Sequence, residues 1–129
     1  GVVPDADALC SAAGTSNVQV VEHLLRARAP INDLASDGLS ALHYAIVNGQ
    51  TEIVELLLRS GGNPDVTTED GTTPLMFAVR GGDVAIVELL LKYGADPLRR
   101  DETGETALDQ AKESNLQAVV TILESHVSK

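Results

Sequence analysis

Apolar residues recur along this chain at an interval of 33 positions. Turn residues and small residues repeat at the same interval, so the pattern extends beyond hydrophobicity. Self-similarity at such a period predicts a protein built from stacked repeats of one supersecondary unit. Five apolar series share one register: Leu9, Leu42, Leu75 and Leu108; Ala12, Ala45, Ala78 and Ala111; Val20, Ile53, Ile86 and Val119; Val21, Val54, Val87 and Val120; and Leu24, Leu57, Leu90 and Leu123.

Each period predicts a short helix followed by a second helix. Ser40, Thr73 and Thr106 stand at expected N-cap positions, and they predict short helices over 41–48, 74–80 and 107–114. Apolar residues spaced by three and four positions then predict a second helix with one buried stripe. Turn glycines end both kinds of helix, with Gly49 and Gly82 after the short helices and Gly61 and Gly94 after the second ones.

The whole chain, residues 1–129, is therefore expected to form a single all-α domain. Its units are predicted at about 5–36, 37–69, 70–102 and 103–127, joined by tight turns such as Asp37-Gly38 and Asp70-Gly71. One helix pair has apolar residues on too many sides to bury them alone, and stacking buries both sides of each inner pair. The first and last units carry smaller or more polar residues, so we expect them to act as caps.

Two segments carry a family signature in the same register. Thr73-Pro74-Leu75-Met76-Phe77-Ala78 and Ser40-Ala41-Leu42-His43-Tyr44-Ala45 resemble the T-P-L-H-x-A motif of ankyrin repeats. The segment Tyr93-Gly94-Ala95-Asp96-Pro97 resembles the closing turn of that family. The resemblance covers essentially the whole chain. It implies an ankyrin-repeat solenoid of helix-turn-helix units linked by β-hairpin-like turns, with partner proteins bound on its concave side.

In ankyrin-like arrays the turn tips and the first helices line this concave side. Carried over by position, the implied protein-binding residues are Ser36, Asp37, Leu39, Tyr44, Val47, Asn48, Glu69, Asp70, Thr72, Arg80, Glu102, Glu105 and Glu113. Leu39 and Val47 are apolar where exposure favours polar residues, so we expect them to form an apolar anchor inside an acidic rim. The alternative is that these positions are ordinary solvated turns.

Charge narrows the choice of partner. The chain has 9 Lys and Arg against 19 Asp and Glu, a net charge of −10, and only 2% aromatic residues. Repulsion from phosphates and the scarcity of stacking residues argue against nucleic-acid binding and favour a protein or peptide of basic character. No apolar run reaches the roughly 18–20 residues that span a membrane. A single cysteine, with no targeting signal, suggests a cytoplasmic or nuclear monomer.

Catalytic or metal-binding constellations are not evident in the sequence. His23, His43 and His126 lack metal-ligand spacing, and Cys10 has no base placed beside it. The resemblance implies that His43 hydrogen-bonds within the turn region. We therefore expect no enzyme activity, no cofactor and no metal, and a protein-protein interaction function. The alternative is a regulatory or targeting domain of a larger enzyme or channel polypeptide, because the chain does not begin with Met.

Overall fold

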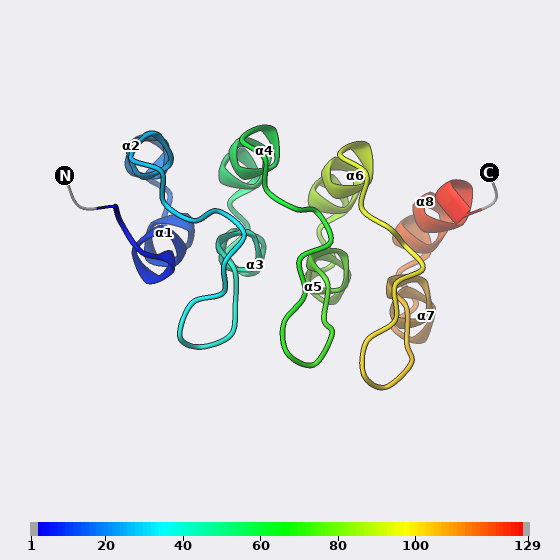
Figure 1. Cartoon of the computed structure of the whole chain (residues 1–129). Coiled ribbons are helices and arrows are strands. Elements are labelled where there is room, and N and C mark those ends of the chain that lie inside the picture. The colour runs from blue at the N-terminus through cyan, green and yellow to red at the C-terminus, as the bar shows by residue number, and fades with distance from the viewer. Residues whose placement is uncertain (1–2, 128–129) are drawn as a thin grey trace.

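The computed structural model describes residues 3–127, which form eight α-helices and no β-strand. Figure 1 shows the helices as a row of pairs, with the two chain ends at opposite ends of the row. This confirms the predicted all-α architecture of stacked units. The helices are α1 (Ala6–Ala13), α2 (Val18–Arg26), α3 (Ala41–Val47), α4 (Thr51–Arg59), α5 (Pro74–Gly81), α6 (Val84–Lys92), α7 (Ala107–Glu113) and α8 (Gln117–Val127).

The short helices begin where their N-caps were predicted. The hydroxyl of Ser40 accepts a hydrogen bond from the backbone N–H of His43 at 3.3 Å. Thr73 and Thr106 cap α5 and α7 in the same way. These side chains satisfy backbone donors that a helix start otherwise leaves without partners. The predicted bounds of α3, α5 and α7 agree with the structure to within one residue at each end.

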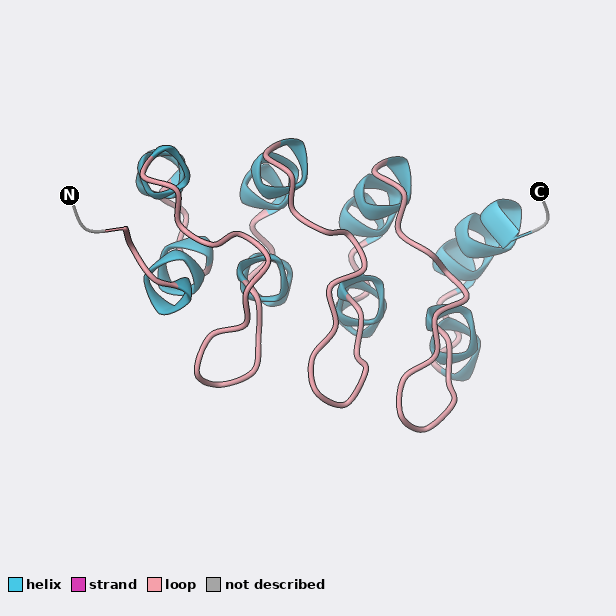
Figure 2. Ribbon diagram, viewed as in Figure 1, coloured by secondary structure: helices cyan, strands magenta, loops and turns pink. Residues whose placement is uncertain are grey.

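The helices form two rows that run along the length of the molecule. Helices α1, α3, α5 and α7 make one row, and α2, α4, α6 and α8 make the other (Figure 1). Each helix packs mainly against its pair partner and against the equivalent helices of adjacent units. Long turns project from the first row between successive pairs (Figure 2). The structure is therefore a solenoid in which contacts pass from neighbour to neighbour.

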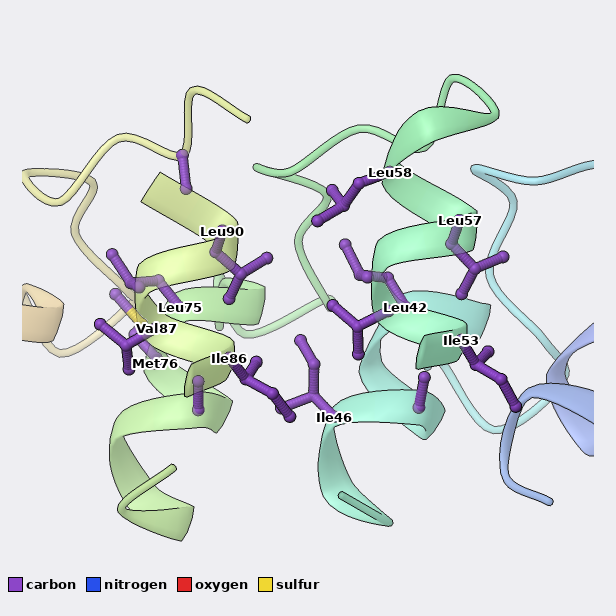
Figure 3. Packing of buried hydrophobic residues seen from close by; sticks show 14 of the residues in the cluster. Leu42, Ile46, Ile53, Leu57, Leu58, Leu75, Met76, Ile86, Val87 and Leu90 are labelled. Carbon is purple, nitrogen blue, oxygen red and sulfur yellow. The ribbon is translucent and has the colours of Figure 1, made fainter. Parts of the chain in front are cut away.

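The buried core runs through all the units. Leu42, Ile53 and Leu57 of α3 and α4 are buried at positions equivalent to those of Leu75, Ile86 and Leu90 in the next pair (Figure 3). All members of the alanine series are also buried, which allows the helices to approach closely. Aliphatic side chains thus supply the apolar burial that drives folding of this aromatic-poor chain.

Helix α2 departs from the predicted pattern. Val20 is 42% exposed, whereas Ile53, Ile86 and Val119 in the same series are buried. Leu24 is only half-buried, although we expected it to be in the core. In the part of the chain that the structure describes, α2 packs on α4 on one side and has no outer helix on the other. The repeat therefore places apolar residues on a face of α2 that no helix within residues 3–127 covers.

Polar side chains also link successive units. The Asn32 carboxamide oxygen accepts a hydrogen bond from the backbone N–H of Asn63 at 2.6 Å. One unit later, Asp65 accepts one from the backbone N–H of Asp96 at 2.9 Å. These bonds satisfy backbone donors in the connecting loops and fix the spacing of neighbouring units.

The long turns that project between successive units depend on glycine at positive φ. Gly38 has φ +87° and Gly71 has φ +81°, in the region that L-residues with a Cβ avoid. The two sites differ in their surroundings. A Cβ at Gly71 would lie 3.1 Å from Asp101 Cα, whereas a Cβ at Gly38 would meet nothing within 4 Å. The next turn also donates a backbone hydrogen bond from Glu102 to Asp70 at 2.9 Å.

We therefore expect Gly71→Ala to lower the free energy of unfolding more than Gly38→Ala does. Both variants incur the strain of a left-handed backbone, roughly 1–2 kcal/mol. Gly71→Ala must also push the neighbouring turn away. Urea denaturation followed by circular dichroism measures both losses, and equal losses would show that the close approach of the two turns contributes nothing.

Candidate functional site

A groove lies between the projecting turns and the first row of helices. It consists of a pocket of about 450 Å³ and an adjoining pocket of about 320 Å³, which share Arg80. We call this surface the turn-side groove. Its lining residues are Ser36, Asp37, Gly38, Leu39, Thr68, Glu69, Asp70, Thr72, Phe77, Arg80, Asp101, Thr103, Glu105, Gln110, Glu113 and Ser114.

The groove brings together most of the residues that the sequence suggested. Tyr44, Val47, Asn48 and Glu102 do not line it. The turn tips and α5 and α7 therefore define the surface, and α3 contributes little to it. The predicted residues that do line the groove are Ser36, Asp37, Leu39, Glu69, Asp70, Thr72, Arg80, Glu105 and Glu113.

The expected apolar anchor is arranged differently from the prediction. Leu39 is half-buried and lines the groove, but Val47 is 60% exposed and lies outside it. Phe77 of α5 supplies the second apolar wall beside Leu39. Phe77 is not among the residues that the resemblance implies for binding. Its position is equivalent to that of Tyr44, which we had selected, so the repeat register could have identified it.

Phe77 is held between a buried residue and a charged one. On one side its ring contacts the imidazole of His43 edge to face, with ring centroids 4.9 Å apart. On the other, the guanidinium carbon of Arg80 lies 5.7 Å from the ring centroid. Such cation–π contacts favour one placement of the arginine side chain. Arg80 is thereby positioned at the junction of the two pockets.

Several groove acids are built into the turns themselves. Asp70 accepts hydrogen bonds from the hydroxyls of Thr68 and Thr72, and these bonds lower the pKa of its carboxyl. The Thr103 hydroxyl does the same for Asp101 and lowers its pKa. Thr72 itself is buried, so its contribution is to orient Asp70. Both carboxylates therefore stay ionised and fixed in direction.

Like charges crowd the far end of the groove. The side chain of Glu113 raises the pKa of Glu105, first through a hydrogen bond to its protonated form and also through charge repulsion. Asp101 and Asp109 add to that repulsion. A bound cation would remove the repulsion between these carboxylates. This end of the groove is thus suited to a lysine or arginine side chain.

His43 has the structural role that we expected. It is fully buried, and its Nδ1 accepts a hydrogen bond from the backbone N–H of Ser40 at 3.1 Å. Burial lowers the pKa of His43 to about 4, and the backbone of Thr72, the charge of Asp70 and the backbone of Val66 oppose this only in part. The neutral ring that accepts from Ser40 completes the capping box of α3.

The remaining candidates for chemistry are inert or dispersed. Cys10 is buried, and burial, with the charges of Asp37 and Asp7, raises the pKa of its thiol to about 11. Such a thiol is a poor nucleophile at neutral pH. Among residues 3–127, no three His, Cys, Asp or Glu side chains are grouped to hold a metal ion. Nor does any helix there have the length and apolar character needed to cross a membrane.

Comparison with known proteins agrees with this architecture. A family model described as ankyrin repeats (3 copies) matches residues 3–68 and again residues 48–129. No curated protein matches the chain. The two family matches together include every helix of the solenoid and both T-P-L-H-x-A-like segments. The chain therefore belongs to the ankyrin repeat family.

Proposed function

We propose that this chain is a non-enzymatic interaction module whose turn-side groove binds a basic segment of a partner protein. Ankyrin repeats generally mediate protein–protein interactions. The observation that carries the proposal is the composition of the groove, in which Leu39 and Phe77 lie beside Asp37, Glu69 and Asp70. An apolar patch within an acidic border suits a partner that presents aliphatic and basic side chains.

The acids of the groove support a charge-driven encounter. The hydrogen bonds from Thr68 and Thr72 lower the pKa of Asp70 and so keep its carboxylate charged at neutral pH. The net charge of −10 attracts basic partners over a longer range and raises the association rate. A basic side chain that binds beside Glu105 and Glu113 relieves the repulsion between them, and this makes the free energy of binding more favourable.

Arg80 divides the groove into two acidic halves. It lines both pockets, and its charge helps to lower the pKa of Asp101. A partner with one continuous run of cations would meet repulsion at this point. The partner is therefore expected to place its basic residues on either side of Arg80, with an apolar residue against Phe77.

We also propose that the last unit caps a monomeric stack, and that the first unit is a less complete cap because Val20 of α2 stays 42% exposed. Leu58 and Leu91 are buried between units, and the equivalent position in the last unit is the exposed Glu124. A polar outer face lets a terminal unit meet water. Size-exclusion chromatography with light scattering tests the monomer directly.

The binding site is tested by charge reversal at groove acids. In Glu69→Lys/Glu113→Lys, both groove halves lose an acid, and we expect loss of basic partners captured from a cell lysate. The control Glu52→Lys/Glu88→Lys makes the same charge change at exposed positions of α4 and α6 and should keep them. Leu39→Ala should weaken binding about tenfold.

Salt dependence provides an independent check. Affinity for the captured partner should fall as salt rises from low to physiological concentration, because exposed charges are screened. Retention of the same partners by both double variants, with no effect of salt, would rule out the turn-side groove as the site.

A further inference from the structure

A further pocket, of about 540 Å³, lies on the row of helices formed by α2, α4, α6 and α8. It opens between α2 and α4 and shares no residue with the turn-side groove. Its apolar lining consists of the half-buried Leu25, Ile31 and Leu56 and the buried Ala29. Its size lies within the range of roughly 300–1,000 Å³ that is typical of ligand-binding pockets.

The repeat shows which kind of side chain fits this position. Ser60 lines the pocket, and the equivalent residue one unit later is Tyr93. The ring of Tyr93 is partly buried and packs against the core, with Lys92 Nζ 5.7 Å from its centroid. Arg59 is the equivalent of Lys92 and also lines the pocket. The unit that contains α4 therefore has a cation, Arg59, at the position of Lys92, but it has Ser60 where the next unit has the ring of Tyr93.

The charge of the pocket is opposite to that of the chain as a whole. Arg26 and Arg59 line it together with a single acid, Glu22. Glu22 pairs with Arg26 at 3.6 Å. Over residues 3–127, Arg59 makes no ion pair, so its guanidinium is available to a ligand.

We propose that the α2–α4 pocket binds an aromatic side chain of a partner protein that is flanked by a carboxylate. The ring lies against Leu25, Ile31 and Leu56 and beneath Arg59, as Tyr93 lies beneath Lys92. The flanking carboxylate pairs with Arg59 or Arg26. A partner protein is a better source of the ring than a second copy of this chain, because Tyr44, Phe77 and Tyr93, the only Tyr and Phe residues in the sequence, already pack against the core of their own fold.

The probe for this pocket is the blocked peptide acetyl-Gly-Asp-Phe-Asp-Gly-amide. Methyl NMR of the wild-type chain should show saturable shifts at Leu25, Ile31 and Leu56. Ser60→Tyr places a ring where the next unit already has one, and should abolish these shifts without lowering the melting temperature. The matched variant Ser60→Ala should bind as the wild type does. Arg59→Gln should weaken binding about threefold.

Peptide controls separate this site from general stickiness. Replacing Phe by Ala in the peptide should remove the shifts, and replacing both Asp by Lys should move binding to the turn-side groove. The proposal is overturned if Ser60→Tyr binds the probe as tightly as Ser60→Ala does. It is also overturned if the pocket methyl groups do not respond at millimolar peptide. Neither result bears on the turn-side groove, which these variants leave unchanged.

Discussion

Replacing Leu57 by alanine is expected to lower the free energy of unfolding by about 2–5 kcal/mol. Leu57 is fully buried in α4, which packs against α2, α3 and α6. The loss combines removal of apolar contacts with the cavity that remains, because helices held on several sides cannot close over it. Chemical denaturation followed by circular dichroism measures the effect.

An exposed leucine provides the matched control. Leu98 is 53% exposed, and Leu98→Ala makes the same chemical change outside the core. We expect its cost to stay within about 0.5 kcal/mol. Similar losses in the two variants would mean that the stripe of α4 does not carry the stability of the stack.

Acidification is expected to destabilise the protein by about 3 kcal/mol between pH 6.5 and pH 4. The pKa of His43 is about 4 in the folded chain, against an ordinary value of 6.5. Within that window the unfolded chain binds a proton that the folded chain does not, so stability is complete above pH 6.5 and is lost as the pH falls. Protonation of Nδ1 also costs the hydrogen bond from the Ser40 N–H. Denaturation midpoints across this pH range measure the effect.

Other titrations can be separated from that of His43. The pKa values of Asp70 and Asp101 are lowered in the folded chain, so these carboxylates stabilise it. That contribution is lost only when the pH falls below the ordinary pKa of 3.8. Glu105 acts in the opposite sense, because its raised pKa makes the fold less stable as the pH rises past 4.5. His43→Gln should flatten the pH dependence, while the exposed His23→Gln should leave it intact. An unchanged slope in His43→Gln would disprove the assignment.

The repeat made most of the fold predictable from sequence. N-caps such as Ser40, turn glycines such as Gly71 and the buried Leu57 series recur in a fixed register, and each has a local physical reason. The exposure of Val20 could not be predicted in that way, because its environment depends on whether a neighbouring helix covers α2. The sequence period identifies the residues of each unit, whereas the burial of those residues also depends on which unit packs beside it.

Asp101 shows why part of the groove escaped sequence reasoning. In one turn Thr68 donates to Asp70, and in the next Thr103 donates to Asp101. Residues 68 and 101 are equivalent, as are 70 and 103, so the donor and the acceptor have exchanged places. When the repeats are aligned by sequence, both positions differ between the two turns, yet each turn has the same threonine-to-aspartate hydrogen bond. Only the geometry shows that both turns orient a carboxylate toward the groove.

Because Cys10 is buried, its reaction with a thiol reagent can be used to measure local opening of the fold. The thiol lies in α1, which packs against α2 and α3, and its hydrogen reaches the Leu39 carbonyl at a donor–acceptor distance of 3.5 Å. Iodoacetamide can therefore label it only when the first helix pair detaches from the stack. Because this cysteine is unique in the chain, the ratio of its labelling rate under native conditions to that of the unfolded chain gives the population of the detached state without any engineered probe.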